Sequence, residues 1–417
     1  MVRESTADLN KQGDILMFKK LALAGALSVM TTGAWAACAY ENTTPLKSLS
    51  AGFEAWKAVT DAMAECGNFQ ASLDQEFREK QPEAFAAKPA LYQIGGVANS
   101  TMVPLLNAGT IRPLDDLVAK YGQHLKPNQL IKVDGKIYAI AMMVNLQHLM
   151  YREDILNDLG IAVPTTYAEM LDAAAKIKEA GVVDYPIGGT FKTGWNLGEE
   201  FINNFLGEGG EFFTDGNMPN INNEKGVAAL EVMKALTEYM DPEYLVSDST
   251  YVQQQFQQGK IAMANLWASR AAAMDDEAES QVVGKVVMAA APMGSERPAS
   301  SLWWDGVVFA TNMTDEVAEA AFQVAMEGMD TEMVKANNDA AVWLIDGFEA
   351  GRLAQGAYET AQKGAAPYPG SGPMGIMHTV LGNGISDYLT GAKDAATTLA
   401  DIEAAYITAA KESGLVQ

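Results

Sequence analysis

Tryptophan residues that stand beside acidic side chains are the groups in this sequence best suited to hold a small polar ligand. The segment Trp303–Asp305 carries two indoles and a carboxyl group, and Trp195 is followed closely by Glu199. An indole offers a flat apolar face, while a neighbouring carboxylate offers hydrogen bonds. A pyranose ring has a flat C–H face and a rim of hydroxyl groups, so both segments predict contact with a carbohydrate.

The adjacent indoles of Trp303 and Trp304 cannot both meet the same ligand. They stand at the start of a predicted strand, where successive side chains point to opposite faces. We therefore expect one of the two to pack in the core and at least one to stack on the ligand. Gln93 is a further candidate, because it ends a predicted strand and open α/β sheets bind ligands at such ends.

Helical and strand-like patterns alternate along the chain, which predicts α/β layers. The best-marked helix is Tyr167–Ala180, where Thr166 and Glu169 form a capping box and Gly181 ends the helix. Trp56 and Trp343 stand on helical apolar stripes and are predicted to lie in the core. Short apolar segments between Gly, Pro or polar turns predict strands at 90–94, 136–144, 185–188, 260–266, 286–291 and 307–311.

Length and charge limit the class of protein. The chain has 417 residues, of which 48% are apolar and 20% charged, enough for two domains with sizeable cores. It has 53 acidic and 29 basic residues and a formal net charge of −24, which disfavours binding to nucleic acid or to anionic lipid. After the leader, no apolar stretch is long enough to span a membrane.

The N-terminal segment 1–36 is predicted to be an extension followed by a signal peptide. Met17–Ala36 begins with Lys19 and Lys20, continues through the apolar stretch Leu21–Met30 and ends in Ala34-Trp35-Ala36, a pattern typical of a cleaved secretory signal. The mature protein is then exported, and we expect it in the periplasm.

The two cysteines, Cys38 and Cys66, stand just beyond this leader. In an oxidising compartment they are expected to form a disulfide, whose loop closure is worth roughly 3 kcal/mol. Two alternatives stay open: a pair of unpaired buried thiols, or a lipid anchor on Cys38, which Trp35 three positions earlier disfavours.

Several segments in order resemble one protein family, the sugar-type extracellular solute-binding proteins of bacterial ABC importers, which are similar to maltose-binding protein. Lys136–Asn145 resembles the crossover segment "GKxYAIP" of that family. The similarity covers roughly residues 88 to 417. The other matching segments are Asn107–Asp116, Tyr151–Asp154, Gly160–Glu169, Asp215–Asn222 and Phe256–Trp267.

This resemblance implies an α/β fold of the type II-like periplasmic-binding-protein kind, with two lobes and a ligand cleft between them. Three crossovers between lobes are expected near 142–146, 290–294 and 338–346. The N-terminal lobe would comprise 37–144 plus 292–342, and the C-terminal lobe 145–291 plus 343–417. The expected partners are a carbohydrate ligand and the permease subunits in the membrane, with the protein itself a monomer.

The resemblance also assigns further ligand contacts. Trp267, together with Arg270, corresponds to an aromatic residue that stacks on sugar from the second lobe, with plain core packing as the alternative. Asn145 lies at a crossover where members place a polar residue, and Tyr368 lies on a loop that faces the cleft. One departure concerns 39–50, which lacks the opening strand of the family and puts contacts from the first loop in doubt.

Other chemistries find little support in the sequence. The three histidines, His124, His148 and His378, stand far apart without metal-ligand spacing, so we expect no metal and no cofactor. The match of Gly370–Gly375 to G-x-G-x-x-G follows a proline-rich loop instead of a strand and does not predict dinucleotide binding.

Two alternatives to a carbohydrate-binding protein stay open. A glycoside-cleaving enzyme would need paired carboxyl groups, for which Glu199, Glu200 and Asp305 are the candidates, but the prediction is that the protein is not an enzyme. An aromatic box could also hold a polyol, a polyamine or a quaternary ammonium ligand.

Overall fold

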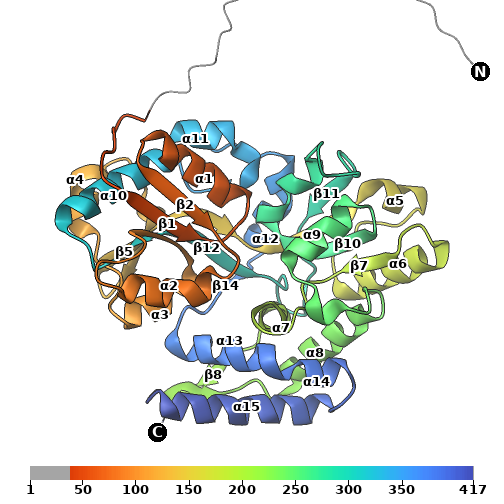
Figure 1. The fold of residues 1–417 in the computed structure, drawn as a ribbon. Coiled ribbons are helices and arrows are strands. Elements are labelled where there is room, and N and C mark those ends of the chain that lie inside the picture. Colours follow the sequence, from red (N-terminus) through yellow and green to blue (C-terminus); the bar gives the residue numbers. More distant parts are fainter. Residues whose placement is uncertain (1–37, 417) are drawn as a thin grey trace, which may run out of the picture. The chain divides into compact units, whose positions relative to one another are not determined.

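The computed structural model describes residues 38–416 of the chain (Figure 1). The predicted extension and signal peptide over 1–36 lie outside the described residues. The described part is a mixed α/β structure with two main sheets, as the sequence predicts. We call the bodies built on these sheets the N-terminal lobe and the C-terminal lobe.

The sheet of the N-terminal lobe has eight strands in the order β13-β5-β12-β3-β1-β2, with β14 added to β12 and β4 to β5. Strands β1, β2 and β3 run parallel, so their carboxyl ends meet at one edge. Strand β12 is antiparallel to β3, which brings its first residues to the same edge. The strands are β1 (Leu46–Ser50), β2 (Phe69–Leu73), β3 (Ile94–Ala98), β4 (Leu130–Val133), β5 (Lys136–Asn145), β12 (Ser301–Phe309), β13 (Val342–Trp343) and β14 (Ala366–Pro367).

Helices cover both faces of this sheet, because alternate strand residues supply apolar side chains to each face. Val307 packs in one cluster with α1, α4, α10 and α11, whereas Val308 packs in another with α2 and α3. Trp56 and Trp343 are both buried in the first cluster, as predicted, although Trp343 lies on a strand and not on a helix. The helices are α1 (Glu54–Glu65), α2 (Phe77–Ala86), α3 (Asn99–Asn107), α4 (Asp115–Tyr121), α10 (Asp315–Gly328) and α11 (Thr331–Ala336).

The sheet of the C-terminal lobe has four strands in the order β11-β6-β10-β7, and β7 and β10 are parallel. A separate hairpin joins β8 (Phe213–Thr214) to β9 (Met218–Pro219). The four strands are β6 (Gln147–Arg152), β7 (Tyr185–Gly188), β10 (Ile261–Trp267) and β11 (Val286–Ala289).

The largest apolar cluster of the protein joins one face of this second sheet to α5–α8 and to the C-terminal helices. Figure 1 shows α13 and α15 (blue) lying side by side beneath α7. Helix α9 packs in a smaller cluster with Met150 and Leu266. The helices are α5 (Glu153–Asp158), α6 (Tyr167–Ala180), α7 (Trp195–Gly207), α8 (Glu224–Thr237), α9 (Ser249–Gln257), α12 (Gln355–Gln362), α13 (Gly372–Gly384), α14 (Ser386–Leu389) and α15 (Ala395–Glu412).

Three main passages join the two lobes, and the chain also returns briefly to the first sheet at β14, between α12 and α13. Strand β5 of the first sheet leads through Leu146 directly into β6 of the second, β11 leads back into β12, and the segment after β13 leads to α12, which packs on β11. The first passage falls within the predicted 142–146. The second spans 290–300 and the third 344–354, each somewhat further along the chain than predicted.

The N-terminal segment is tied to the first helix. Cys38 and Cys66, directly after α1, form a disulfide, which confirms the predicted pairing. The two sulfur atoms are bonded to each other in this structure. It therefore has neither the unpaired thiols nor the lipid-anchored Cys38 of the two alternatives.

Candidate functional site

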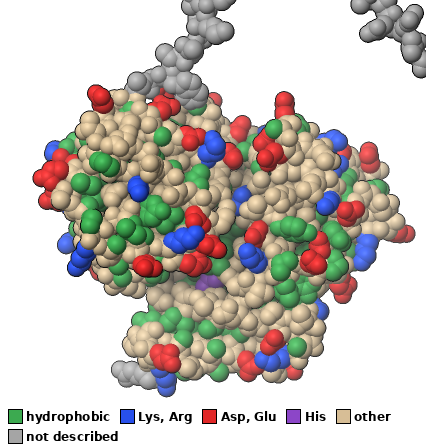
Figure 2. Space-filling model, in the orientation of Figure 1, with side chains coloured by type: hydrophobic (Ala, Val, Ile, Leu, Met, Phe, Trp, Pro, Cys, Tyr) green, Lys and Arg blue, Asp and Glu red, His purple; other side chains and the backbone are tan. Residues whose placement is uncertain are grey.

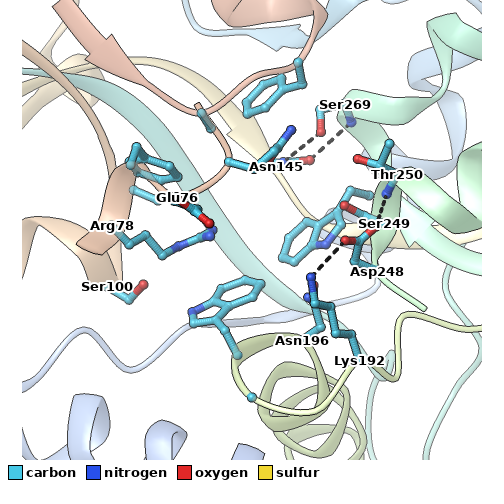
Figure 3. Close-up of a pocket in the computed structure, with 18 of the residues that line it drawn as sticks. Glu76, Arg78, Ser100, Asn145, Lys192, Asn196, Asp248, Ser249, Thr250 and Ser269 are labelled. Atoms are coloured by element: carbon cyan, nitrogen blue, oxygen red, sulfur yellow. Dashed lines mark hydrogen bonds and ion pairs between the residues drawn. The ribbon is translucent and has the colours of Figure 1, made fainter. Parts of the chain in front are cut away.

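A cavity of about 560 Å³ lies between the two lobes (Figures 2 and 3). In the N-terminal lobe its wall is formed by the segments that follow β1, β2 and β3, whose carboxyl ends share one edge. In the C-terminal lobe the wall is formed by the segments that follow the parallel strands β7 and β10. Both lobes thus contribute the edge at which open α/β sheets bind ligands.

Three tryptophans form one side of the cavity. Trp195 begins α7, Trp267 ends β10 and Trp303 lies near the start of β12. The Trp195 ring lies 6.2 Å from the Trp267 ring in a near-parallel arrangement and 5.5 Å from the Trp303 ring edge-on, between ring centroids. The Trp267 and Trp303 rings meet edge-on at 6.0 Å. Such contacts fix the planes of all three indoles without a ligand.

Trp195 is positioned by two glycines. Gly194, just before α7, has φ +96°, a conformation that side chains larger than glycine rarely adopt. Its amide donates to the carbonyl of Gly382 on α13 over 3.0 Å, and a Cβ on Gly382 would overlap the backbone of Gly194. The first turn of α7 can therefore lie against α13 only because Gly382 has no side chain.

Tyr368 and His378 lie behind this wall, within the protein. The His378 ring stacks on the Trp195 ring at 5.0 Å, and the Tyr368 ring lies 4.0 Å from that of Trp303. His378 Nε2 is 2.8 Å from the carbonyl oxygen of Trp195, which can only accept, so Nε2 carries the proton. Nδ1 then accepts from the Tyr368 hydroxyl over 2.9 Å. Burial lowers the pKa of His378 to about 4, which keeps the ring neutral at pH 7.

Glu199 holds Trp303 from the same side. Its Oε1 accepts from the Trp303 indole Nε1 over 2.9 Å and from the Ser301 hydroxyl over 2.6 Å, while Oε2 is buried without a hydrogen-bond partner. The residue is 1% exposed, and burial raises its pKa to about 8. At neutral pH the carboxyl group is therefore largely protonated.

Glu200, next on α7, faces a different set of partners. It accepts hydrogen bonds from Gln147 Nε2 over 2.8 Å and from the Thr190 hydroxyl. Burial raises its pKa to about 7. Neither Glu199 nor Glu200 lines the cavity, so of the three carboxyl groups proposed for glycoside cleavage only Asp305 does.

Polar and charged groups form the rest of the cavity wall. At the first passage between the lobes, Asn145 Nδ2 donates to Ser269 Oγ over 3.2 Å. Asp305 is buried, and this burial raises its pKa to about 7, with the charge of Arg78 acting in the opposite direction. Figure 3 shows Arg78 extending into the cavity from one side and Lys192, Asn196 and Asp248 lying on the other.

Most of the residues proposed from the sequence come together here. Tyr368 and Glu199 lie directly behind the indoles and support them. Those that line the cavity are Asn145, Trp195, Trp267, Arg270, Trp303 and Asp305.

Two of the proposed residues lie elsewhere. Gln93 precedes β3, and its side chain accepts from the Lys47 amide over 2.9 Å and donates to the Ala90 carbonyl over 3.1 Å. The predicted strand 90–94 is in fact 94–98, so the end of the strand that lines the cavity is Ala98 and not Gln93. Trp304 points to the opposite face of β12 from Trp303 and packs with the cluster of α2 and α3.

Several cavity residues escaped the sequence prediction. Residues 39–50 were expected to lack the opening strand, but Leu46–Ser50 forms β1, and Ala51 and Phe53 after it line the cavity. Gln75–Glu79, at the start of α2, also line it. The alternation of Leu46, Ser48 and Ser50 with Lys47 and Leu49 carries no clear strand signal, since the buried Ser48 and Ser50 are polar.

Within 38–416 no group of three or more His, Cys, Asp or Glu side chains could hold a metal ion. The same residues include no helix that is long and apolar enough to cross a membrane.

Solved structures with the same fold are numerous. An ABC-transporter solute-binding protein of Agrobacterium radiobacter in complex with ribitol has a TM-score of 0.77 at 20% identity, over 88% of this chain and 98% of that one. A solute-binding protein of Agrobacterium vitis with bound D-mannitol has a TM-score of 0.71 at 20% identity, over 88% and 99%. A maltose-bound protein of T. maritima has a TM-score of 0.72 at 17% identity, over 87% and 98%.

The family comparison agrees with these structural matches. The sequence model of one family, described as bacterial extracellular solute-binding protein, matches residues 68–379, which is most of the chain. The chain belongs to the bacterial extracellular solute-binding proteins.

Proposed function

We propose that this protein is the solute-binding component of an ABC importer, and that it captures a carbohydrate in the cavity between its lobes. The observation that carries this proposal is the wall of three indoles, Trp195, Trp267 and Trp303, with hydrogen-bonding groups around it. Flat aromatic faces next to amides and charged groups suit the C–H faces and hydroxyl groups of a sugar. Relatives of the same fold that bind ribitol, mannitol and maltose support it.

The mechanism we propose is closure of two lobes over the ligand. The lobes are taken as 37–144 plus 292–342 and 145–291 plus 343–417, although Asn145, Trp343 and the short strand β14 still pair with the sheet of the N-terminal lobe. The ligand touches both lobes. A ligand that contacts both lobes binds the closed state better than an open one and shifts the population toward closure. The closed protein then delivers its ligand to a membrane permease. The protein acts as a periplasmic monomer, without a cofactor and without catalysing a reaction.

Positive charge in the cavity argues against the cationic ligands. The guanidinium carbon of Arg78 already lies 4.6 Å from the centre of the Trp195 ring, where a quaternary ammonium or polyamine would stack. Arg270 adds a second positive charge to the cavity wall. A cationic ligand would have to displace one guanidinium and approach the other.

The test is a titration of the wild-type protein with a panel of sugars and polyols, followed by indole variants. We expect Trp195→Ala and Trp267→Ala each to weaken binding of the sugar that the panel identifies by about 1–3 kcal/mol. The measurement is isothermal titration calorimetry, with thermal unfolding to verify the fold.

Trp304→Ala is the matched control, since this indole is next to Trp303 in sequence but packs away from the cavity. Unchanged affinity in both cavity variants, or a loss in Trp304→Ala as large as theirs, would contradict the proposed site. Stabilisation by betaine or spermidine without any response to sugars would contradict the carbohydrate function.

A further inference from the structure

The arginines of the described chain fall into two groups. Four of them, Arg112, Arg152, Arg297 and Arg352, form ion pairs with Asp315, Asp154, Glu296 and Asp275. The remaining two in 38–416 are Arg78 and Arg270, and neither forms an ion pair with a described carboxylate. Both line the cavity between the lobes. In a chain with 53 acidic and 29 basic residues, carboxylate partners are abundant, so this placement of the two unpaired guanidinium groups calls for a ligand.

The guanidinium group of Arg78 is positioned by aromatic rings that contact its faces and not by hydrogen bonds from its N–H groups. Its central carbon lies 4.7 Å from the centre of the Phe77 ring and 4.6 Å from that of Trp195, which is on the other lobe. It donates no hydrogen bond to the described residues, and its Nε is buried without a partner. Stacking occupies the faces of a guanidinium and leaves the in-plane N–H groups free for an acceptor. Figure 3 shows this side chain reaching into the cavity.

Arg270 follows β10 in the C-terminal lobe, and its hydrogen-bond partners are uncharged. It donates to Gln253 Oε1 and to Ser249 Oγ, each over 3.1 Å. Burial lowers its pKa to about 10, so the group stays positively charged at neutral pH. The charge is therefore held in place without being neutralised by a direct partner.

The acidic groups of the cavity do not neutralise these two charges. Asp248 pairs with Lys192 over 3.3 Å and caps α9, and Glu76 pairs with Lys80 over 3.1 Å. Glu79 is exposed on the outer rim. The carboxyl groups whose charges act on Arg78 are those of Glu79, Asp305 and Glu199. None of them forms an ion pair with it, and burial disfavours the ionised forms of Asp305 and Glu199.

We propose that the ligand is a sugar acid, a carbohydrate whose carboxylate is bound by Arg78 through two parallel N–H···O bonds, while Arg270 supplies a second positive charge from the opposite lobe. This inference rests on the proposed function and specifies the class of carbohydrate. The planar fork of an arginine matches the two oxygens of a carboxylate. The sugar ring then contacts Trp267 and the part of the Trp195 indole that the Arg78 guanidinium leaves uncovered.

The experiment compares ligands that differ only in the charged group. The wild-type protein is titrated with D-galactose, D-galacturonate and D-galactose 6-phosphate, with the corresponding glucose series, and with neutral and uronate disaccharides. We expect a carboxylate-bearing member to bind at least about tenfold more tightly than its neutral counterpart, because a bidentate charge-assisted pair forms in a partly desolvated site.

Arginine variants test whether Arg78 and Arg270 cause the tighter binding of carboxylate-bearing sugars. Arg78→Gln is expected to lower the ratio of acid to neutral affinity by about 10- to 100-fold, and Arg270→Gln by less, because Arg270 keeps neutral partners of its own. Arg78→Lys keeps the charge without the fork and should fall between the wild type and Arg78→Gln. Arg297→Gln, which removes a positive charge outside the cavity, is the matched control, and thermal unfolding reports on the fold of each variant.

The possible outcomes separate this proposal from the one it rests on. If neutral sugars bind as tightly as their acids, or if Arg297→Gln changes the ratio as much as Arg78→Gln, the sugar-acid proposal is wrong while the carbohydrate function stands. Tight binding of the phosphates but not of the carboxylates overturns the carboxylate assignment as well. If no carbohydrate of any charge binds, both proposals are overturned.

Discussion

A buried carboxyl group that forms no ion pair has consequences for the pH dependence of folding. Glu199 is bonded to the Trp303 indole and the Ser301 hydroxyl and has no ion-pair partner within 38–416. Its pKa is raised from 4.5 to about 8. Between these two values the folded chain holds a proton that the unfolded chain releases, so this group stabilises the fold fully below pH 4.5 and loses that contribution as the pH rises through 8.

We therefore expect the melting temperature of the wild type to fall between pH 6.5 and pH 8.5, with a smaller fall in Glu199→Gln. The amide oxygen can still accept from Trp303 and Ser301 but carries no proton to lose. Thermal unfolding followed by circular dichroism at several pH values measures the difference. Glu200 and Asp305, whose pKa values are raised to about 7, also make the melting temperature fall with rising pH. They are present in both proteins, so the difference between wild type and Glu199→Gln reports on Glu199.

The buried histidines change the stability of the fold in the opposite direction, and they do so at lower pH. The pKa of His148 is lowered to about 3 and that of His378 to about 4 by burial, so their contribution is lost as the pH falls below 6.5. This is why the comparison is confined to values above pH 6.5. A fall in melting temperature as steep in Glu199→Gln as in the wild type would contradict the assignment.

At the scale of elements, the contact of α7 with α13 sets the position of Trp195. A Cβ on Gly382 would overlap the backbone of Gly194, whereas a Cβ on Gly375, on the same helix, would meet nothing within 4 Å. We expect Gly382→Ala to destabilise the fold by about 1–3 kcal/mol through overpacking and to weaken ligand binding by displacing Trp195.

Gly375→Ala supplies the control for that substitution. It lies in α13 with open space around it, and it should raise stability by up to about 1 kcal/mol through helix propensity. Chemical denaturation gives the free energy of unfolding of both variants, and calorimetric titration gives their affinities. Equal effects of the two substitutions would show that the close contact does not matter.

Local signals in the sequence predict some elements well. The helix Tyr167–Ala180 has the predicted bounds, because the Thr166 hydroxyl accepts from the Glu169 amide and Gly181 ends the helix with φ +63°. The strand Tyr185–Gly188 also has its predicted bounds. The bounds of both elements are set by residues that are adjacent in the chain, so they can be identified from the sequence.

Elements whose limits depend on distant partners were predicted less well. Strand β3 lies four residues beyond its predicted position, since its register is set by pairing with β1 and β12. In the site, the three indoles of the wall were predicted from their neighbours and from the family resemblance. The part played by Arg78 was not, because its stacking on Trp195 joins residues 117 positions apart and leaves no local pattern.

At the scale of the molecule, the cavity is formed by both lobes, so ligand binding should change their relative position. We expect saturation with the carbohydrate found in the panel to lower the radius of gyration measured by small-angle X-ray scattering. A ligand that binds the closed state about 10⁴-fold more tightly than the open state, a difference of roughly 5.5 kcal/mol, would convert a mostly open population to a mostly closed one.

Trp195→Ala at the same ligand concentration is the control for closure, because it removes an indole that lines the cavity in the C-terminal lobe. Its radius of gyration should respond only at higher ligand concentrations than that of the wild type. An unchanged radius at full occupancy of the wild type would contradict closure.

The wall of indoles also gives the protein an optical property. The rings of Trp195, Trp267 and Trp303 lie 5.5–6.2 Å apart between centroids, and the other tryptophans described here, Trp56, Trp304 and Trp343, belong to the N-terminal lobe clusters. Because transition dipoles at such separations couple, we expect the three rings to give a paired positive and negative band in circular dichroism. A ligand that shifts Arg78 or tilts one ring should alter that band, so circular dichroism of the unlabelled protein is expected to report on binding.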